Sequence, residues 1–254
     1  MARRPRTRRR LVLRLLIGAA VTSVVLIAIA VFVAFQLAGE NPEWWRPLNP
    51  NDERTVEAAQ TVEIDVTNAL HQSRPATPEH SPESWTISVG EAEANAWLAA
   101  RLRDWLANQD DAFTWPAELS EPQIDFRDGN VVIGAGFKRG QAVEVLAVTL
   151  LPRTDKDGAL WLEAESVSIG KLSIPASWAL SGSASFIKDR LPSHVLEKPE
   201  GKRVLNVLSG KEPLTKSAIL NLSDGRRVRV LAVKAKDNAL LVTCRTEPPG
   251  IARE

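Results

Sequence analysis

An uncharged and strongly apolar run of 24 residues, residues 15–38, constrains the fold of this chain more than any other feature. A bilayer core about 30 Å thick takes about 20 helical residues to cross. A cleavable signal peptide has a shorter apolar region, of about 7–15 residues, followed by an A-x-A-like site. The sequence AFQLAGE at the end of this run lacks that pattern. Because backbone amides in hydrocarbon must be satisfied within the segment, the run predicts a permanent transmembrane helix over residues 15–38.

The charges that flank this run are strongly asymmetric. Seven arginines carry all the charge of residues 1–14, whereas Glu40 and Glu43 follow the other end. The positive-inside rule therefore predicts a cytoplasmic N-terminus and an extracytoplasmic domain, held in the inner (cytoplasmic) membrane of the cell. The predicted topogenic residues are the arginines nearest the run, Arg8, Arg9, Arg10 and Arg14.

Two tryptophans, Trp44 and Trp45, follow the apolar run directly. Indole rings favour the membrane–water interface, so we expect both to act as interface anchors in contact with the lipid bilayer.

Two alternatives remain open for the N-terminal pattern. The stretch TRRRLVL at residues 7–13 is close to a twin-arginine export signal, and an arginine cluster also suits contact with nucleic acid or anionic lipid headgroups.

The rest of the chain is acidic. Residues 15–254 hold 25 Lys and Arg against 31 Asp and Glu, a net charge of −6. This composition lacks the basic footprint of a nucleic-acid-binding domain, so we expect no nucleic-acid partner. The single cysteine, Cys244, excludes an intrachain disulfide, and its place on a strand face with Leu240 and Val242 predicts a buried small residue.

Shifts in composition divide the chain into six segments. Prolines at 42, 47 and 50 predict a stiff connector, and a second proline-rich stretch at residues 73–84 predicts a linker. Between them, residues 53–70 carry apolar side chains at helical spacing. The segments are a basic cytoplasmic tail (1–14), the transmembrane helix (15–38), a juxtamembrane linker and helix (39–84), an α+β extracytoplasmic domain (85–198), a C-terminal β-meander module (199–247) and a loose tail (248–254).

The predicted α+β domain opens with a helix and continues with strands. Ser88 and Glu91 have capping-box spacing at the start of a long helix over residues 89–108. From residue 122 the pattern changes to strands, with a hairpin turn at Asp128-Gly129. A change of the apolar face in the fourth strand predicts a bulge near Ser166.

The rest of the domain holds a shorter helix and then the meander. Pro175 suits the first turn of the helix, and residues 192–212 are polar and predict an irregular segment. Turns at residues 224–225 and 237–238 predict three strands. The predicted fold class is therefore α+β, with an N-terminal transmembrane helix, a curved antiparallel sheet packed with one long and one shorter helix, and a C-terminal three-strand meander.

The order of these elements resembles the YpmS-like family of bacterial single-pass membrane-anchored proteins. The likeness covers about residues 1–191 and rests on Asn95 in the long helix and on a G-x-L-x-I-P corner formed by Gly170, Leu172, Ile174 and Pro175. The resemblance implies a single N-terminal span and a helix that precedes a curved antiparallel sheet. It implies no established activity, and a looser likeness extends to tubular lipid-binding folds of the bacterial envelope.

Motifs for catalysis or metal binding are weak. His71, His80 and His194 have no metal-ligand spacing, so we expect no metal and no cofactor. Ser185 and Lys188 match the S-x-x-K pattern of Ser/Lys hydrolases, but the companion K-T-G motif is missing. We therefore expect the protein not to be an enzyme, with a Ser/Lys hydrolase as the least favoured alternative.

The favoured hypothesis is a binding module. A groove between the helix over residues 89–108 and the curled sheet would hold a lipid or other apolar ligand, with apolar burial supplying the affinity. The alternative is an envelope scaffold or assembly protein that binds a protein partner and no ligand. The predicted groove residues are Trp97, Leu98, Trp105, Trp161 and Trp178.

Overall fold

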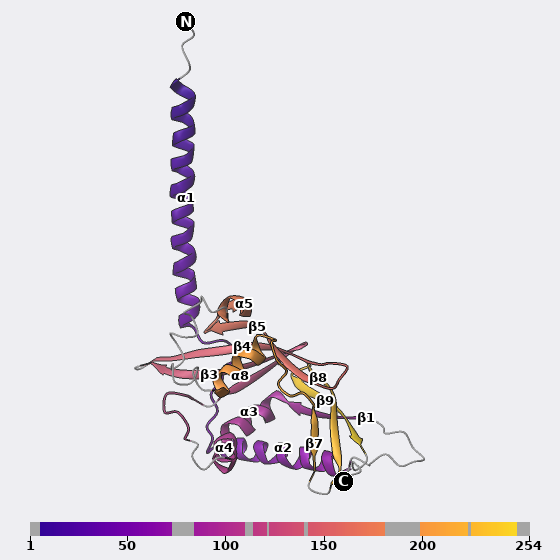
Figure 1. Ribbon diagram of the computed structural model, residues 1–254. Helices are drawn as coiled ribbons and strands as arrows, with labels where there is room; N and C mark the ends of the chain where they lie inside the picture. The colour runs from indigo at the N-terminus through magenta and orange to yellow at the C-terminus, as the bar shows by residue number, and fades with distance from the viewer. Residues whose placement is uncertain are drawn as a thin grey trace.

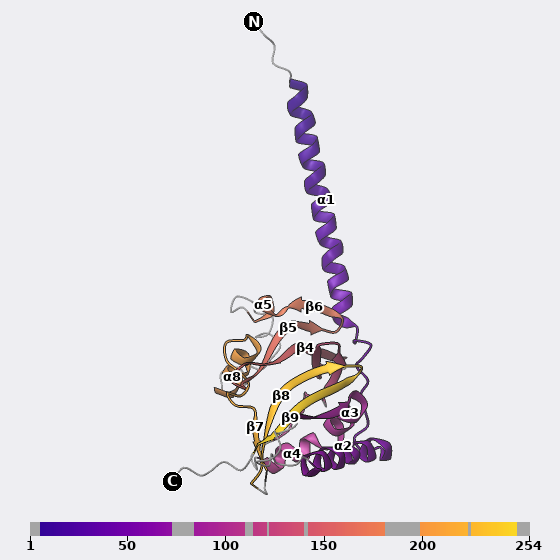
Figure 2. The same cartoon turned by 90° about the vertical axis from the view of Figure 1, so that its right-hand side faces the viewer.

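The computed structural model describes residues 6–72, 84–109, 114–120, 122–139, 142–180, 199–222 and 225–247. These residues form six helices and two antiparallel sheets, which confirms the predicted α+β class. One helix, α1 (Arg6–Gly39), projects from the rest of the molecule (Figure 1). The other elements lie together at its C-terminal end, where both sheets and the remaining helices form the domain (Figure 2).

Helix α1 exposes apolar side chains along its C-terminal half. Phe35 is 78% exposed, and Leu26, Ile27 and Phe32 are each at least 60% exposed. Helices that pack in a domain bury such side chains. Among the described residues, α1 meets the domain at its last turn, where the backbone nitrogen of Lys171 donates a hydrogen bond to the carbonyl of Leu37. The side chains of α1 are described from Thr22 onward. Among the residues whose side chains are described, no helix is long and apolar enough to span a membrane.

The larger sheet has five strands. The predicted Asp128-Gly129 hairpin turn is confirmed, with Gly129 at φ 87°. The predicted bulge is also confirmed, because the pairing of β4 with β5 moves from Thr149↔Ser166 to Leu150↔Ala164 and leaves Glu165 as the extra residue. The strands follow the order β2 (Gln123–Arg127), β3 (Asn130–Arg139), β4 (Ala142–Thr154), β5 (Leu160–Ile169) and β6 (Leu172–Pro175).

The smaller sheet contains the predicted C-terminal meander, which is confirmed. Its turn at Asp237 and Asn238 has φ values of 53° and 58°, the positive values that a tight two-residue hairpin requires. The sheet also holds a strand from much earlier in the chain, since Trp85 pairs with Cys244. The strands follow the order β1 (Ser84–Gly90), β9 (Ala239–Glu247), β8 (Arg227–Lys236) and β7 (Ile219–Asn221).

The helices of the domain differ from the predicted ones in two places. The single helix expected over residues 89–108 is two helices, α3 (Glu91–Ala100) and α4 (Leu102–Gln109), separated at Arg101 with φ −122°. Residues 199–208, expected to be irregular, form α8 (Pro199–Leu208), because Val207 packs into the domain at 6% exposure. The other two helices are α2 (Glu53–Gln72), which packs against α3, and α5 (Ala176–Ala179).

Two apolar clusters hold the sheets and helices together. In one, Phe126 and Val131 of the larger sheet contact Ala235 of the smaller sheet. In the other, Leu150 and Ala164 pack against Ala176 of α5. Cys244 is 2% exposed, which confirms the expected burial, and this burial raises the pKa of its thiol.

Candidate functional site

The segment after α1 lies across one face of the five-stranded sheet. Two glycines of β3 leave room for it: a Cβ on Gly134 would lie 2.5 Å from Cη2 of Trp44, and a Cβ on Gly136 would lie 3.2 Å from Cζ2 of Trp45. The backbone nitrogen of Arg46 donates a hydrogen bond of 2.8 Å to Oε1 of Gln123. The connector is therefore part of the domain and positions its tryptophans on the sheet.

The two tryptophans predicted as interface anchors have different environments. The ring of Trp45 packs inside the domain and is 7% exposed, which leaves it little surface for lipid headgroups. Trp44 is half-buried and meets Trp45 edge to face, with ring centroids 5.8 Å apart. A contact between Trp44 and the membrane interface stays a prediction.

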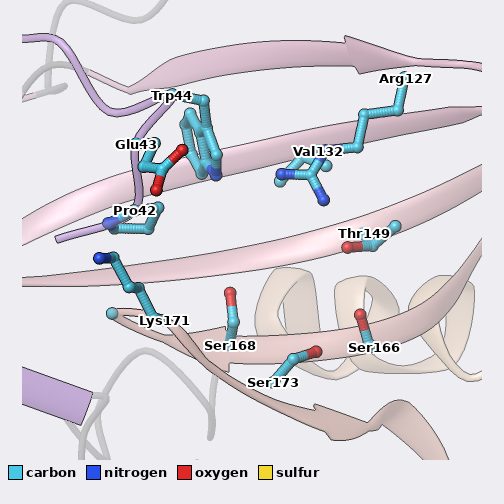
Figure 3. Close-up of a pocket in the computed structure, with 11 residues that line it drawn as sticks. Pro42, Glu43, Trp44, Arg127, Val132, Thr149, Ser166, Ser168, Lys171 and Ser173 are labelled. Carbon is cyan, nitrogen blue, oxygen red and sulfur yellow. The ribbon is translucent and has the colours of Figure 1, made fainter. Parts of the chain in front are cut away.

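A groove of about 490 Å³ lies beside Trp44 on the same face of the sheet. Its floor carries four hydroxyl groups, from Thr149, Ser166, Ser168 and Ser173. The strand register places them in neighbouring positions, since Thr149 pairs with Ser166 and Ser168 pairs with Ser173. Figure 3 shows Ser168 next to Lys171, and Arg127 on the far side of Thr149 from Ser166. The remaining lining residues are Pro42, Glu43, Trp44, Val132 and Gly170.

Both cations of the groove are held by carboxylates. Nζ of Lys171 lies 2.8 Å from Oε2 of Glu40, and Nε of Arg127 lies 2.6 Å from Oδ2 of Asp125. The hydrogen bond and the negative charge of Glu40 raise the pKa of Lys171, so its amine stays protonated. With Glu43 also in the lining, positive and negative charges nearly balance around the four hydroxyls.

The groove adjoins the C-terminal end of α1 because the turn between β5 and β6 is bonded to it. The backbone nitrogen of Lys171 donates a hydrogen bond of 2.9 Å to the carbonyl of Leu37. Gly170 adopts φ 53°, and a Cβ there would lie 2.4 Å from the carbonyl oxygen of Glu40. Only glycine fits this contact, which explains the glycine of the G-x-L-x-I-P corner in structural terms.

The structure brings together only part of the predicted apolar groove. Trp97 and Trp105 contact each other, with ring centroids 6.3 Å apart. Trp97 faces α2 and donates a hydrogen bond of 3.1 Å from Nε1 to Oε1 of Glu63. Leu98 is half-buried on α3. Trp97 therefore packs near α2, whereas Trp105 is 49% exposed on α4.

The other two predicted groove residues lie on different elements. Nε1 of Trp161 donates a hydrogen bond of 2.9 Å to Oδ2 of Asp155, which lowers the pKa of that carboxyl. The guanidinium of Arg153 lies 4.6 Å from the ring centroid of Trp161. Trp178 is 70% exposed on α5, at the opposite end of the domain from α4 in both views (Figures 1 and 2).

The remaining candidates are the Ser/Lys pair, the histidines and the topogenic arginines. Ser185, Lys188, His80 and His194 lie outside the described residues. In the part of the chain that the structure describes, no group of three or more His, Cys, Asp or Glu side chains is placed to hold a metal ion. The four topogenic arginines lie in the N-terminal turns of α1: Arg8, Arg9, Arg10 and Arg14.

Sequence reasoning missed the hydroxyl groove, although a signal for it exists. In SVSIGKLS, residues 166–173, small polar residues alternate with apolar ones on both sides of a glycine. Such alternation predicts a strand face that is small and polar, and a turn at Gly170 places Ser173 beside Ser168. No protein-family model, curated protein or solved structure matches this chain, so the function is argued from the site alone.

Proposed function

We propose that the protein is a single-pass membrane protein whose extracytoplasmic domain binds the polar, hydroxyl-rich headgroup of a membrane amphiphile. The observation that carries this proposal is the groove of about 490 Å³ with four hydroxyls on its floor, placed directly beside the C-terminal end of α1. Its volume lies within the range of about 300–1,000 Å³ that is typical of ligand sites.

The membrane anchor is supported by α1 and the sequence within it. The uncharged run of residues 15–38 lies inside one continuous helix. At about 1.5 Å per residue this run is roughly 36 Å long, enough for a hydrocarbon core of about 30 Å. The arginines at its N-terminal end support a cytoplasmic location for that end. The groove then faces the outer surface of the inner membrane.

The chemistry of the lining favours a neutral or zwitterionic polyol, such as a sugar headgroup. Hydroxyl groups both donate and accept hydrogen bonds, which matches the hydroxyls of a sugar. A strongly anionic ligand would have to compete with Glu40 for Lys171 and with Asp125 for Arg127. The half-buried ring of Trp44 adds an apolar wall at the edge of the groove.

Native mass spectrometry of the full-length chain, extracted from its own membrane in detergent, tests this function. Ser168→Leu places a bulky apolar side chain on the groove floor, and Ser88→Leu makes the same change at an exposed position of β1. We expect a bound species on the wild type and on Ser88→Leu, and its loss on Ser168→Leu.

The mass of the bound species identifies its source. A mass that contains fatty acyl chains indicates a glycolipid, whereas a free oligosaccharide indicates a soluble glycan of the envelope. A wild-type chain without any bound species, and without binding when a glycolipid is supplied in nanodiscs, would contradict the proposal. The scaffold alternative would then be the better account.

A further inference from the structure

We propose that α5 forms a second contact with the bilayer, in which Trp178 inserts at the level of the lipid headgroups. This inference rests on the membrane anchor proposed above and does not depend on the ligand of the groove. It gives Trp178 the same kind of interface role that the sequence predicts for Trp44 and Trp45. The occupant of this surface is the lipid bilayer that holds α1.

The first observation is the exposure of Trp178. Helix α5 turns Ala176 and Ala179 into the domain, at 3% and 2% exposure, and Ala176 packs against Leu150. The two residues between them, Ser177 and Trp178, are exposed, and Trp178 is 70% exposed. The packing of the two alanines therefore holds a large indole ring at the surface.

The second observation is the position of α5 relative to α1. Strand β6 begins two residues after Gly170, whose turn is bonded to the end of α1 through Leu37 and Glu40. Helix α5 follows β6 directly. Both views show α5 and β6 at the end of the domain nearest α1, level with the last turns of that helix (Figures 1 and 2).

The last turns of α1, and α5 beside them, are expected to lie at the boundary of the bilayer. The first charged residue after the apolar run is Glu40, so the hydrocarbon core ends close to Ala38. An element that is level with Ala38 lies among the headgroups. Tryptophan is enriched at this depth because its ring is apolar and its N–H group is polar. Two contacts, α1 and Trp178, would then fix the tilt of the domain and hold the groove beside the headgroups.

Fluorescent labelling in proteoliposomes tests this contact with the full-length chain. Trp178→Cys and Leu220→Cys each place one reactive thiol at an exposed position, and Leu220 is 54% exposed on β7 at the far end of the domain. The native Cys244 is 2% exposed, and the unmutated chain measures any background labelling. Each variant is labelled with an environment-sensitive fluorophore in vesicles of phosphatidylethanolamine and phosphatidylglycerol.

We expect the label at position 178 to emit at shorter wavelength than the label at position 220, and to be quenched by a lipid with its quencher near the headgroup. Equal emission from both positions would overturn the inference. Extraction with alkaline carbonate tests the membrane anchor separately from the contact of α5. A chain released by carbonate contradicts the anchor itself, whereas a retained chain with a water-like label at position 178 contradicts only the contact of α5. Near-ultraviolet circular dichroism of both variants checks that the domain is folded.

Discussion

Glu247, at the end of β9, lies among three arginines, Arg227, Arg229 and Arg245. Nε of Arg229 donates to its Oε1, and Nη2 of Arg229 lies 3.4 Å from its Oε2. Arg245 lies 3.7 Å from Oε1, and the side chain of Glu247 is only 18% exposed. The hydrogen bond from Arg229 lowers the pKa of Glu247 below the ordinary value of a glutamate.

A lowered pKa in the folded state makes this residue a source of acid sensitivity. Its stabilisation is present above the ordinary glutamate pKa and is lost as the pH falls through the lowered value. Between about pH 7 and about pH 3 we expect the wild type to lose about 1 kcal/mol more unfolding free energy than Glu247→Gln. Chemical denaturation followed by tryptophan fluorescence measures this difference. Glu57→Gln, an exposed position of α2, serves as the control, and parallel curves for wild type and Glu247→Gln would contradict the expectation.

Single residues also show where sequence reasoning succeeds and where it fails. The burial of Cys244 followed from its neighbours on one strand face, because alternation along a strand is a local signal. The position of Trp45 did not follow, because its burial depends on Gly136, which lies far along the chain on another element. The same limit applies to the groove, whose hydroxyls are local to residues 166–173 but whose walls come from the connector after α1.

At the scale of elements, the pairing of β1 with β9 changes how the C-terminal region is understood. The sequence predicted a C-terminal β-meander module over residues 199–247, and in the structure β1 is the edge partner of β9 from Ser84↔Arg245 to Gly90↔Ala239. Ala235 of β8 also belongs to the cluster of Phe126 and Val131. The meander therefore shares a sheet with β1 and an apolar cluster with β2 and β3.

A truncation tests whether the meander is separable. A chain that ends after residue 212 lacks the ladder partner of β1 and the side chains of Ala235 and Leu240, so we expect its domain to lose its fixed tertiary structure. A chain that ends after Glu247 lacks only the predicted loose tail and should keep the wild-type fold. Near-ultraviolet circular dichroism and limited proteolysis distinguish the two. A protease-resistant core of residues 84–180 in the shorter chain would show that the meander is an added module.

The elements that the sequence predicted are those with local signals. Turn residues and alternating apolar residues marked the strands of the meander and the Asp128-Gly129 hairpin. The pairing of β1 had no such signal, because its partner lies about 150 residues away. The break at Arg101 lacked one as well, since the sequence there contains no glycine or proline and the apolar spacing continues into α4.

At the scale of the whole molecule, the function proposed above depends on a fixed relation between α1 and the domain. Within the described residues, that relation rests on two contacts. The connector after α1 packs Trp44 and Trp45 on the sheet, and the turn at Gly170 and Lys171 contacts the last turn of α1 and Glu40. The ion pair between Lys171 and Glu40 is exposed, and such pairs contribute little to stability. Of the two interactions made by this turn, the backbone contact of Gly170 therefore contributes more than the ion pair to holding the domain against α1.

Two glycines that both have positive φ but differ in their neighbours test whether the contact of Gly170 orients the domain. Gly170 has φ 53° and Gly129 has φ 87°, so alanine at either position costs about 1–2 kcal/mol of unfolding free energy. A Cβ at 170 would also meet the carbonyls of Leu37, Ala38 and Glu40, whereas a Cβ at 129 meets nothing within 4 Å. Gly170→Ala should therefore be destabilised at least as much as Gly129→Ala, and only Gly170→Ala should detach the turn from α1. In vesicles, a label at Trp178→Cys should then shift to water-like emission with Gly170→Ala and stay lipid-like with Gly129→Ala, while both chains resist carbonate extraction. If the label responds equally to the two substitutions, the turn at Gly170 does not orient the domain.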